Sequence, residues 1–182
     1  NVFRAVDLPI SYSQGFNVHP QVSFGPPLSL GVQGRNEYFD FILKETTDTK
    51  YLFETLNQAM PKALQLNEII LLSDRAMLAM NYYKYEEVTV IPPAEYFAKF
   101  QTKTAEFQKV EEFLFTRIRK DNEQTKDLKP LIGKIEWNGS QLAVIKTVVG
   151  ASIFDVLEHV YQIDRHETNR FEIIREKLMV DE

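Results

Sequence analysis

The chain contains no cysteine, three histidines and a single tryptophan among its 182 residues. Without cysteine it forms no disulfide, no thiolate metal site and no iron–sulfur cluster of its own. The sequence also lacks an apolar run of about 18 residues, which is the length that a membrane-spanning helix needs. These absences fit a protein of a reducing compartment, and we predict the cytoplasm.

Neither sign of charge dominates the chain. It carries 21 basic and 26 acidic residues, for a formal net charge of −5, which argues against a protein that coats nucleic acid through its overall charge. Residues 117–134 differ, because six basic and three acidic side chains leave them with a local charge of +3. Arg117, Arg119 and Lys120 begin this stretch, and we predict them as phosphate contacts. The alternative is a solvated hairpin whose lysines protect a sheet edge.

Glycine and proline are scarce but concentrated. Three of the 7 glycines and four of the 8 prolines fall within residues 8–31, so this backbone turns repeatedly and cannot form one helix. Elsewhere, a hydrophobic content of 44 % and an aromatic content of 12 % predict a packed core rather than a disordered chain.

Apolar periodicity and turn residues predict an α+β fold. We expect a helix near 51–59 with its cap within Thr46-Thr47-Asp48, a second near 93–110, and a third near 152–161 with Ser152 as its cap. We expect strands near 37–43, 64–72, 82–91, 114–119, 131–137, 141–149 and 171–179. The order of these elements predicts two packed ferredoxin-like subdomains of the split β-α-β type, with antiparallel sheets, over residues 1–81 and 82–182. Residues 2–6 have the pattern of a helix end, so we expect the first subdomain to be truncated and an upstream segment to precede it.

Polar side chains stand between the turns of the Gly/Pro-rich segment. Loops of this kind often bind ligands, and the predicted ligand-binding residues are Tyr12, Ser13, Gln14, Gly15, Asn17, His19 and Ser23. The alternative is a structural corner in which Asn17 and His19 bond the loop's own backbone. His19 is also a weak candidate for acid/base catalysis, because neither a second histidine nor an acid lies near it to orient it.

The sequence predicts no metal site. His159 and His166 are seven residues apart, whereas two ligands on one helix usually stand about four apart. A surface pair near the end of the last helix is the simpler interpretation. No phosphate-binding loop, dinucleotide fingerprint or nucleophile elbow is present either.

Two stretches near the start carry a resemblance to a known family. They read Leu-Pro-Ile-Ser-Tyr-Ser-Gln-Gly-Phe-Asn-Val-His-Pro at 8–20 and Ser-Phe-Gly-Pro-Pro-Leu-Ser-Leu-Gly-Val at 23–32. They resemble the signature of the radical-SAM-linked domain family, a domain of unknown function fused to or encoded beside radical S-adenosylmethionine proteins. We call residues 8–32 the signature segment. Val18 departs from the family, which usually has proline there, and weaker matches occur at 37–40, 56–61, 155–158 and 174–176.

The resemblance implies a partner protein that holds an iron–sulfur cluster and S-adenosylmethionine. It implies no particular reaction. Taken with the polar loop and the basic stretch, it leads us to expect a non-catalytic accessory domain that binds a substrate, with RNA as the candidate. A module that only docks on the radical S-adenosylmethionine partner is the alternative, followed by an enzyme that uses His19.

Overall fold

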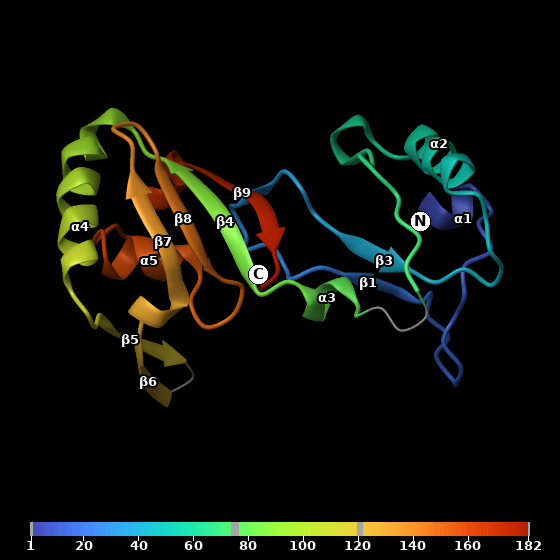
Figure 1. Ribbon diagram of the computed structural model, residues 1–182, viewed down its shortest axis with the longest axis horizontal. Helices are drawn as coiled ribbons and strands as arrows, with labels where there is room; N and C mark the ends of the chain where they lie inside the picture. The colour runs from blue at the N-terminus through green and yellow to red at the C-terminus, as the bar shows by residue number, and fades with distance from the viewer. Residues whose placement is uncertain (1, 74–76, 120–121, 182) are drawn as a thin grey trace. The chain divides into compact units, whose positions relative to one another are not determined.

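Figure 1 shows the computed structural model of the chain, which describes residues 2–73, 77–119 and 122–181. The chain forms two compact units. The first comprises the chain up to Gly25 together with Tyr38–Met80, and the second comprises Pro26–Glu37 together with the chain from Asn81 onward. The signature segment is thus divided between the units after Gly25, which the sequence does not predict.

The first unit is assembled around a short antiparallel strand pair. Its elements are α1 (Val2–Ala5), β1 (Val22–Phe24), β3 (Phe39–Phe41), α2 (Thr49–Ala59) and the 3-10 turn η1 (Lys62–Leu64), and α3 (Ala79–Tyr82) begins where the chain passes to the second unit. Val22 pairs with Phe41, and the ring of Phe3 packs on those of Phe39 and Phe41. Aromatic contacts therefore join α1 to the strands.

Helix α2 begins where the sequence predicts it. The Asp48 carboxylate accepts a hydrogen bond from the Tyr51 N–H at 2.8 Å, as an N-cap residue does. Leu52 and Leu56, four residues apart, are the buried side chains of the helix, because this spacing places them on one face.

The predicted strand at 64–72 is wrong. Residues 65–73 form no strand, and the side chains of Ile70, Leu71 and Leu72 are exposed. The Asn57 side chain instead accepts from the Leu66 N–H at 2.6 Å and donates to its carbonyl at 3.0 Å. An apolar pattern alone does not make a strand, because a strand also needs a neighbour for its backbone groups.

The second unit is built on a five-stranded sheet in the order β2-β9-β4-β8-β7. These strands are β2 (Gln33–Gly34), β9 (Glu172–Met179), β4 (Tyr85–Ile91), β8 (Leu142–Thr147) and β7 (Ile132–Trp137). Neighbours are antiparallel except β2 and β9, which are parallel.

Helices α4 (Phe97–Lys109), preceded by the 3-10 turn η2 (Ala94–Tyr96), and α5 (Ile153–His159) cover one face of this sheet (Figure 1). Phe100 of α4 and Leu157 of α5 are buried in one apolar cluster with Val88 of β4 and Val144 of β8. Further short turns are η3 (Lys129–Leu131) and η4 (Glu167–Arg170). Helices packed on a largely antiparallel sheet confirm the predicted α+β class.

A separate hairpin, β5 (Leu114–Arg119) with β6 (Asn122–Asp127), is inserted between α4 and β7. The Asp127 carboxylate accepts from the Phe113 N–H at 2.8 Å and the Lys129 N–H at 3.0 Å, which fixes the base of the hairpin. The sequence predicts β5 but not β6, because the polar run Asn-Glu-Gln-Thr-Lys-Asp has no apolar alternation. Arg117 is positioned by this hairpin.

Helix α5 begins with a capping box. The Ser152 hydroxyl accepts from the Asp155 N–H at 3.2 Å, and the Asp155 carboxylate accepts from the Ser152 N–H at 2.5 Å. Two N–H groups that the helix leaves without intrahelical partners are thereby satisfied. The cap predicted at Ser152 is confirmed.

We expect Ser152→Ala to lower the free energy of unfolding of the second unit by about 1 kcal/mol, because it removes one side of the capping box. Urea titration followed through Trp137, the only tryptophan, reports on this unit. Thr102→Ala on the exposed face of α4 is the matched control and should change stability by less than about 0.5 kcal/mol. Equal effects of the two changes would contradict the role given to the cap.

Candidate functional site

The first half of the signature segment closes on itself through its backbone. The Ser13 N–H donates to the His19 carbonyl at 2.8 Å, and the His19 N–H donates to the Ser13 hydroxyl at 3.0 Å. On either side of the Ser13–His19 pair along the chain, the Gln21 N–H donates to the Ser11 carbonyl at 2.8 Å. Gly15 has a φ of +126°, a conformation that glycine adopts without strain. The loop therefore turns at Gly15.

The tip of this loop turns its side chains to solvent. Phe16 is completely exposed, at 103 % of its reference area. Gln14, Asn17 and His19 are also exposed, and within the described residues their side chains make no hydrogen bond to the chain. Asn17 and His19 thus do not bond the loop's own backbone through their side chains.

The remaining predicted loop residues have more local surroundings. Tyr12 is exposed at the base of the loop, where it bridges to Pro20. Ser13 is half-buried through its contact with His19, and Ser23 is half-buried within β1. The structure therefore gathers the seven predicted loop residues in the first unit, with Gln14, Asn17 and His19 the most available to a ligand.

The second unit holds a polar pocket of about 340 Å³. None of the seven predicted loop residues lines it. The signature segment contributes Pro27 and Ser29, and the predicted phosphate contact Arg117 reaches it from β5. The full lining is Pro27, Ser29, Glu86, Arg117, Lys146, Val148, Gly150, Ala151, Ser152 and Asp155.

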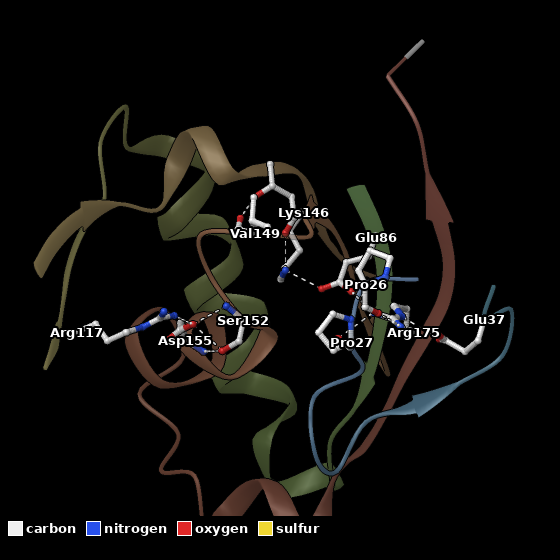
Figure 2. Close-up of polar contacts among 11 residues, drawn as sticks. Pro26, Pro27, Glu37, Glu86, Arg117, Lys146, Val149, Ser152, Asp155 and Arg175 are labelled. Carbon is white, nitrogen blue, oxygen red and sulfur yellow. Dashed lines mark hydrogen bonds and ion pairs between the residues drawn. The ribbon is translucent and has the colours of Figure 1, made fainter. Parts of the chain in front are cut away.

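A buried arginine contacts Pro27 and Glu86, two residues of the pocket lining (Figure 2). Arg175 of β9 is 2 % exposed and forms a two-pronged ion pair with Glu37, with Nε 2.9 Å from one carboxylate oxygen. It also donates to the carbonyls of Pro26 at 2.8 Å and Pro27 at 3.5 Å, and to Glu86 at 3.2 Å. Burial alone would lower the pKa of Arg175, but Glu37 and Glu86 raise it above its ordinary value. The guanidinium is therefore a permanent cation.

Glu86 joins this arginine to a buried lysine. Lys146 of β8 is 1 % exposed, and its Nζ lies 2.7 Å from a Glu86 oxygen and 2.7 Å from the Thr147 carbonyl. Glu86 and Lys146 are directly opposite each other across β4 and β8. A buried charge is tolerated only when it is paired in this way, so Glu86 is needed to keep both cations in place.

Asp155 forms the other charged centre of the pocket (Figure 2). One of its oxygens accepts from the Ser152 N–H at 2.5 Å, from the Ser152 hydroxyl at 2.6 Å and from Arg117. Burial raises the pKa of Asp155, but the hydrogen bonds from Ser152 and the pairing with Arg117 outweigh it, and the net shift is downward. Asp155 is therefore ionised at neutral pH and holds Arg117 at the pocket.

The remaining residues singled out in the sequence are Arg119, Lys120, His159 and His166, and neither histidine is in the pocket lining. The side chain of Arg119 and the whole of Lys120 lie outside the described residues. His159 packs against the Phe115 ring at 5.1 Å, and the backbone N–H of His166 donates to Asp164. Within residues 2–73, 77–119 and 122–181 no group of three or more histidine and acidic side chains is placed to hold a metal ion.

Sequence reasoning misses Glu86, Lys146 and Arg175, although a signal for two of them exists. Glu86 stands two residues before the buried Val88, and Lys146 two residues after the buried Val144. Because strand side chains alternate between faces, both charges fall on the core face of the sheet. A charged residue two positions away from an apolar core residue of a predicted strand is therefore the sequence signal that could have identified Glu86 and Lys146.

We expect Arg175→Met to lower the free energy of unfolding of the second unit by about 3–5 kcal/mol, because Glu37 and Glu86 lose a buried partner. Urea titration through Trp137 fluorescence measures the loss. Lys177→Met on the same strand removes an exposed ion pair with Glu87 and should cost less than about 1 kcal/mol. Similar losses for both variants would show that the buried contacts do not hold this unit together.

Asp155→Asn should destabilise the second unit by about 2 kcal/mol at pH 7, because it removes charge-assisted hydrogen bonds. The lowered pKa of Asp155 means that its stabilisation is present above the ordinary value of about 3.9 and is lost as pH falls through the lower folded value. The stability gap between the wild type and Asp155→Asn should therefore narrow as pH falls below about 4. Urea titrations of both proteins from neutral to acidic pH test this, and a constant gap would contradict it.

Comparisons with known proteins place the chain in a family. The model of a family described as "Uncharacterized protein conserved in bacteria (DUF2344)" matches residues 1–167. No curated protein and no solved structure gives a significant match. Because the match covers the loop, the pocket and most of both units, the chain belongs to this family of uncharacterized bacterial proteins, DUF2344.

Proposed function

We propose that this chain is a non-catalytic accessory domain that binds a substrate for a radical S-adenosylmethionine protein, and that the substrate is RNA. The observation that carries the proposal is the loop at 12–20. Its backbone is closed by its own hydrogen bonds, whereas its amide, imidazole and phenyl side chains face solvent. Ordering a loop costs conformational entropy, and this one presents recognition groups that the fold itself does not use.

The exposed groups are those that single-stranded RNA recognition uses. Unpaired bases stack on exposed aromatic rings and hydrogen-bond to amide side chains. Phe16 offers such a ring, and Gln14 and Asn17 each offer a donor and an acceptor. With a net charge of −5, the chain would bind RNA through this local surface rather than through its overall charge.

The chemistry would belong to the partner. The chain has no cysteine, so its residues do not fit an iron–sulfur cluster, and the cluster and S-adenosylmethionine would sit on the radical S-adenosylmethionine protein. The resemblance of the signature segment supports this division of roles. No described helix has the length and apolar character to cross a bilayer, and we propose the cytoplasm as the location.

A protein-docking module is the second candidate, and the loop's apolar side chains favour it. Phe16 and Val18 of the loop are exposed at 103 % and 57 %, and exposed apolar groups often mark protein contacts. In this alternative the loop would contact the radical S-adenosylmethionine protein itself. Catalysis by His19 has less support, because within the described residues no carboxylate bonds its imidazole.

The ferredoxin-like architecture also remains our inference. In the second unit α4 follows β4 and α5 follows β8, and the strand order β9-β4-β8-β7 supports a split β-α-β arrangement with the β5–β6 hairpin inserted.

Filter binding with a structured RNA tests the proposal. The wild type should bind at low salt and lose affinity as salt rises, and Asn17→Ala/His19→Ala should bind about tenfold more weakly, because it removes two recognition groups. Gln58→Ala/His166→Ala also removes one carboxamide and one imidazole, at exposed positions outside the loop, and should bind like the wild type. Absence of binding at low salt, or binding that salt does not weaken, would refute the RNA substrate.

Capture of the radical S-adenosylmethionine protein separates the two candidates. If Phe16→Ser abolishes capture by the purified chain while RNA binding is absent in every variant, the docking module is the better description. If the chain binds RNA through the loop and captures the partner equally well with Phe16→Ser, the substrate-binding role holds.

A further inference from the structure

The two cations that line the pocket of the second unit have hydrogen-bond donors that the described residues leave unused. Arg175 contributes none of them, because each of its nitrogens already donates to Glu37, Glu86 or the carbonyls of Pro26 and Pro27. Its partners Pro27 and Glu86 line the pocket. The unused donors belong to Lys146 and Arg117.

Lys146 supplies the first unused hydrogen-bond donor. Its ammonium group has three N–H bonds and two partners, Glu86 and the Thr147 carbonyl. The side chain is 1 % exposed and lines the pocket, so bulk water has little access to it. A buried ammonium is favoured when an acceptor meets every N–H, and the pocket is where such an acceptor would sit.

Arg117, which lies on β5, supplies the other unused hydrogen-bond donors. Its guanidinium has five N–H bonds, and among the described residues only Asp155 accepts a side-chain hydrogen bond from it. Arg117 belongs to β5 and Lys146 to β8, and in Figure 2 the Arg117 side chain points to Asp155 while that of Lys146 points to Glu86. The two cations therefore approach the pocket from different strands.

The acceptors of the pocket are largely engaged. Both oxygens of Glu86 are paired, one with Lys146 and one with Arg175. One oxygen of Asp155 already takes three donors, from Ser152 and Arg117. Three of the four carboxylate oxygens that line the pocket are therefore engaged by the protein, and a guest rich in acceptors finds its partners in Lys146 and Arg117.

We propose that this pocket binds the oxoanion group of a small ligand, a phosphate ester or a carboxylate, between Lys146 Nζ and the Arg117 guanidinium. Charge-assisted hydrogen bonds of this kind are the stronger class, and a tetrahedral or trigonal oxoanion presents several acceptors to donors from different directions. The volume of about 340 Å³ is at the lower end of the range for small-molecule sites, which leaves room for an organic group beyond the oxoanion. The proposal goes beyond the RNA-binding loop and does not depend on it.

Nuclear magnetic resonance of the ¹⁵N-labelled full chain tests this directly. Titration with inorganic phosphate should shift the backbone amides of Gly150, Ala151 and Ser152, which line the pocket, in a saturable way with a Kd in about the millimolar range. Sodium chloride at the same ionic strength is the reference for general salt effects. Equal shifts in both salts, or shifts scattered over the surface, would overturn the proposal.

A set of variants assigns the effect to the pocket. Arg117→Gln should weaken phosphate binding about tenfold or more, and Arg117→Lys should restore part of it, because the charge returns without the planar fork. Lys134→Gln is the matched control, since Lys134 is an exposed cation of the same unit paired with Glu136, and it should bind like the wild type. Equal weakening by Arg117→Gln and Lys134→Gln would overturn the assignment.

Sodium acetate in a parallel titration distinguishes the two ligand sources. Tighter saturation by phosphate than by acetate would assign a phosphate ester, and the reverse would assign a carboxylate. If neither anion saturates, the wild-type titration alone overturns the proposal, even where a variant fails to fold. Asn17→Ala/His19→Ala should bind phosphate unchanged, so failure at the loop and failure at the pocket are separate results.

Discussion

The buried guanidinium of Arg175 is the interaction on which the second unit depends. A cation that is 2 % exposed is stable only where anions and carbonyls surround it, and Glu37, Glu86 and the Pro26 carbonyl meet that need. These partners come from widely separated parts of the sequence. Strand β2 pairs with β9 over only two residues, so the arginine contributes much of the attachment of residues 26–37 to the sheet.

The same network positions the pocket. Glu86 pairs with both Arg175 and Lys146, so one carboxylate holds the lysine that lines the pocket and the arginine next to it. On the other side, the capping box of α5 holds Asp155, which in turn holds Arg117. Both cations are thus fixed before any ligand arrives, and a site organised in this way loses less freedom on binding.

The sequence predicted correctly those features that depend only on residues close together in the chain, such as helix caps. The caps at Asp48 and Ser152 and the buried positions of α2 follow from residue types and helical spacing. The strand expected at 64–72 failed because its pairing depends on a distant neighbour that the sequence pattern does not reveal. The charge network was missed for the same reason: Arg175 pairs with Glu37 across 138 residues, and no spacing rule connects them.

The signature segment serves two physical roles, and its composition explains both. Up to Gly25 the backbone turns at Gly15 and is joined by its own hydrogen bonds, while side chains such as that of Asn17 are exposed. From Pro26 onward it contributes carbonyls instead, because proline has no N–H and its fixed φ favours an extended backbone. Two successive prolines thus direct acceptors to Arg175 without leaving an unpaired donor beside a buried cation. The glycines and prolines of residues 8–31 are therefore dense for two reasons. The first part must turn sharply while its side chains stay exposed, and the second must offer carbonyl groups to the buried Arg175.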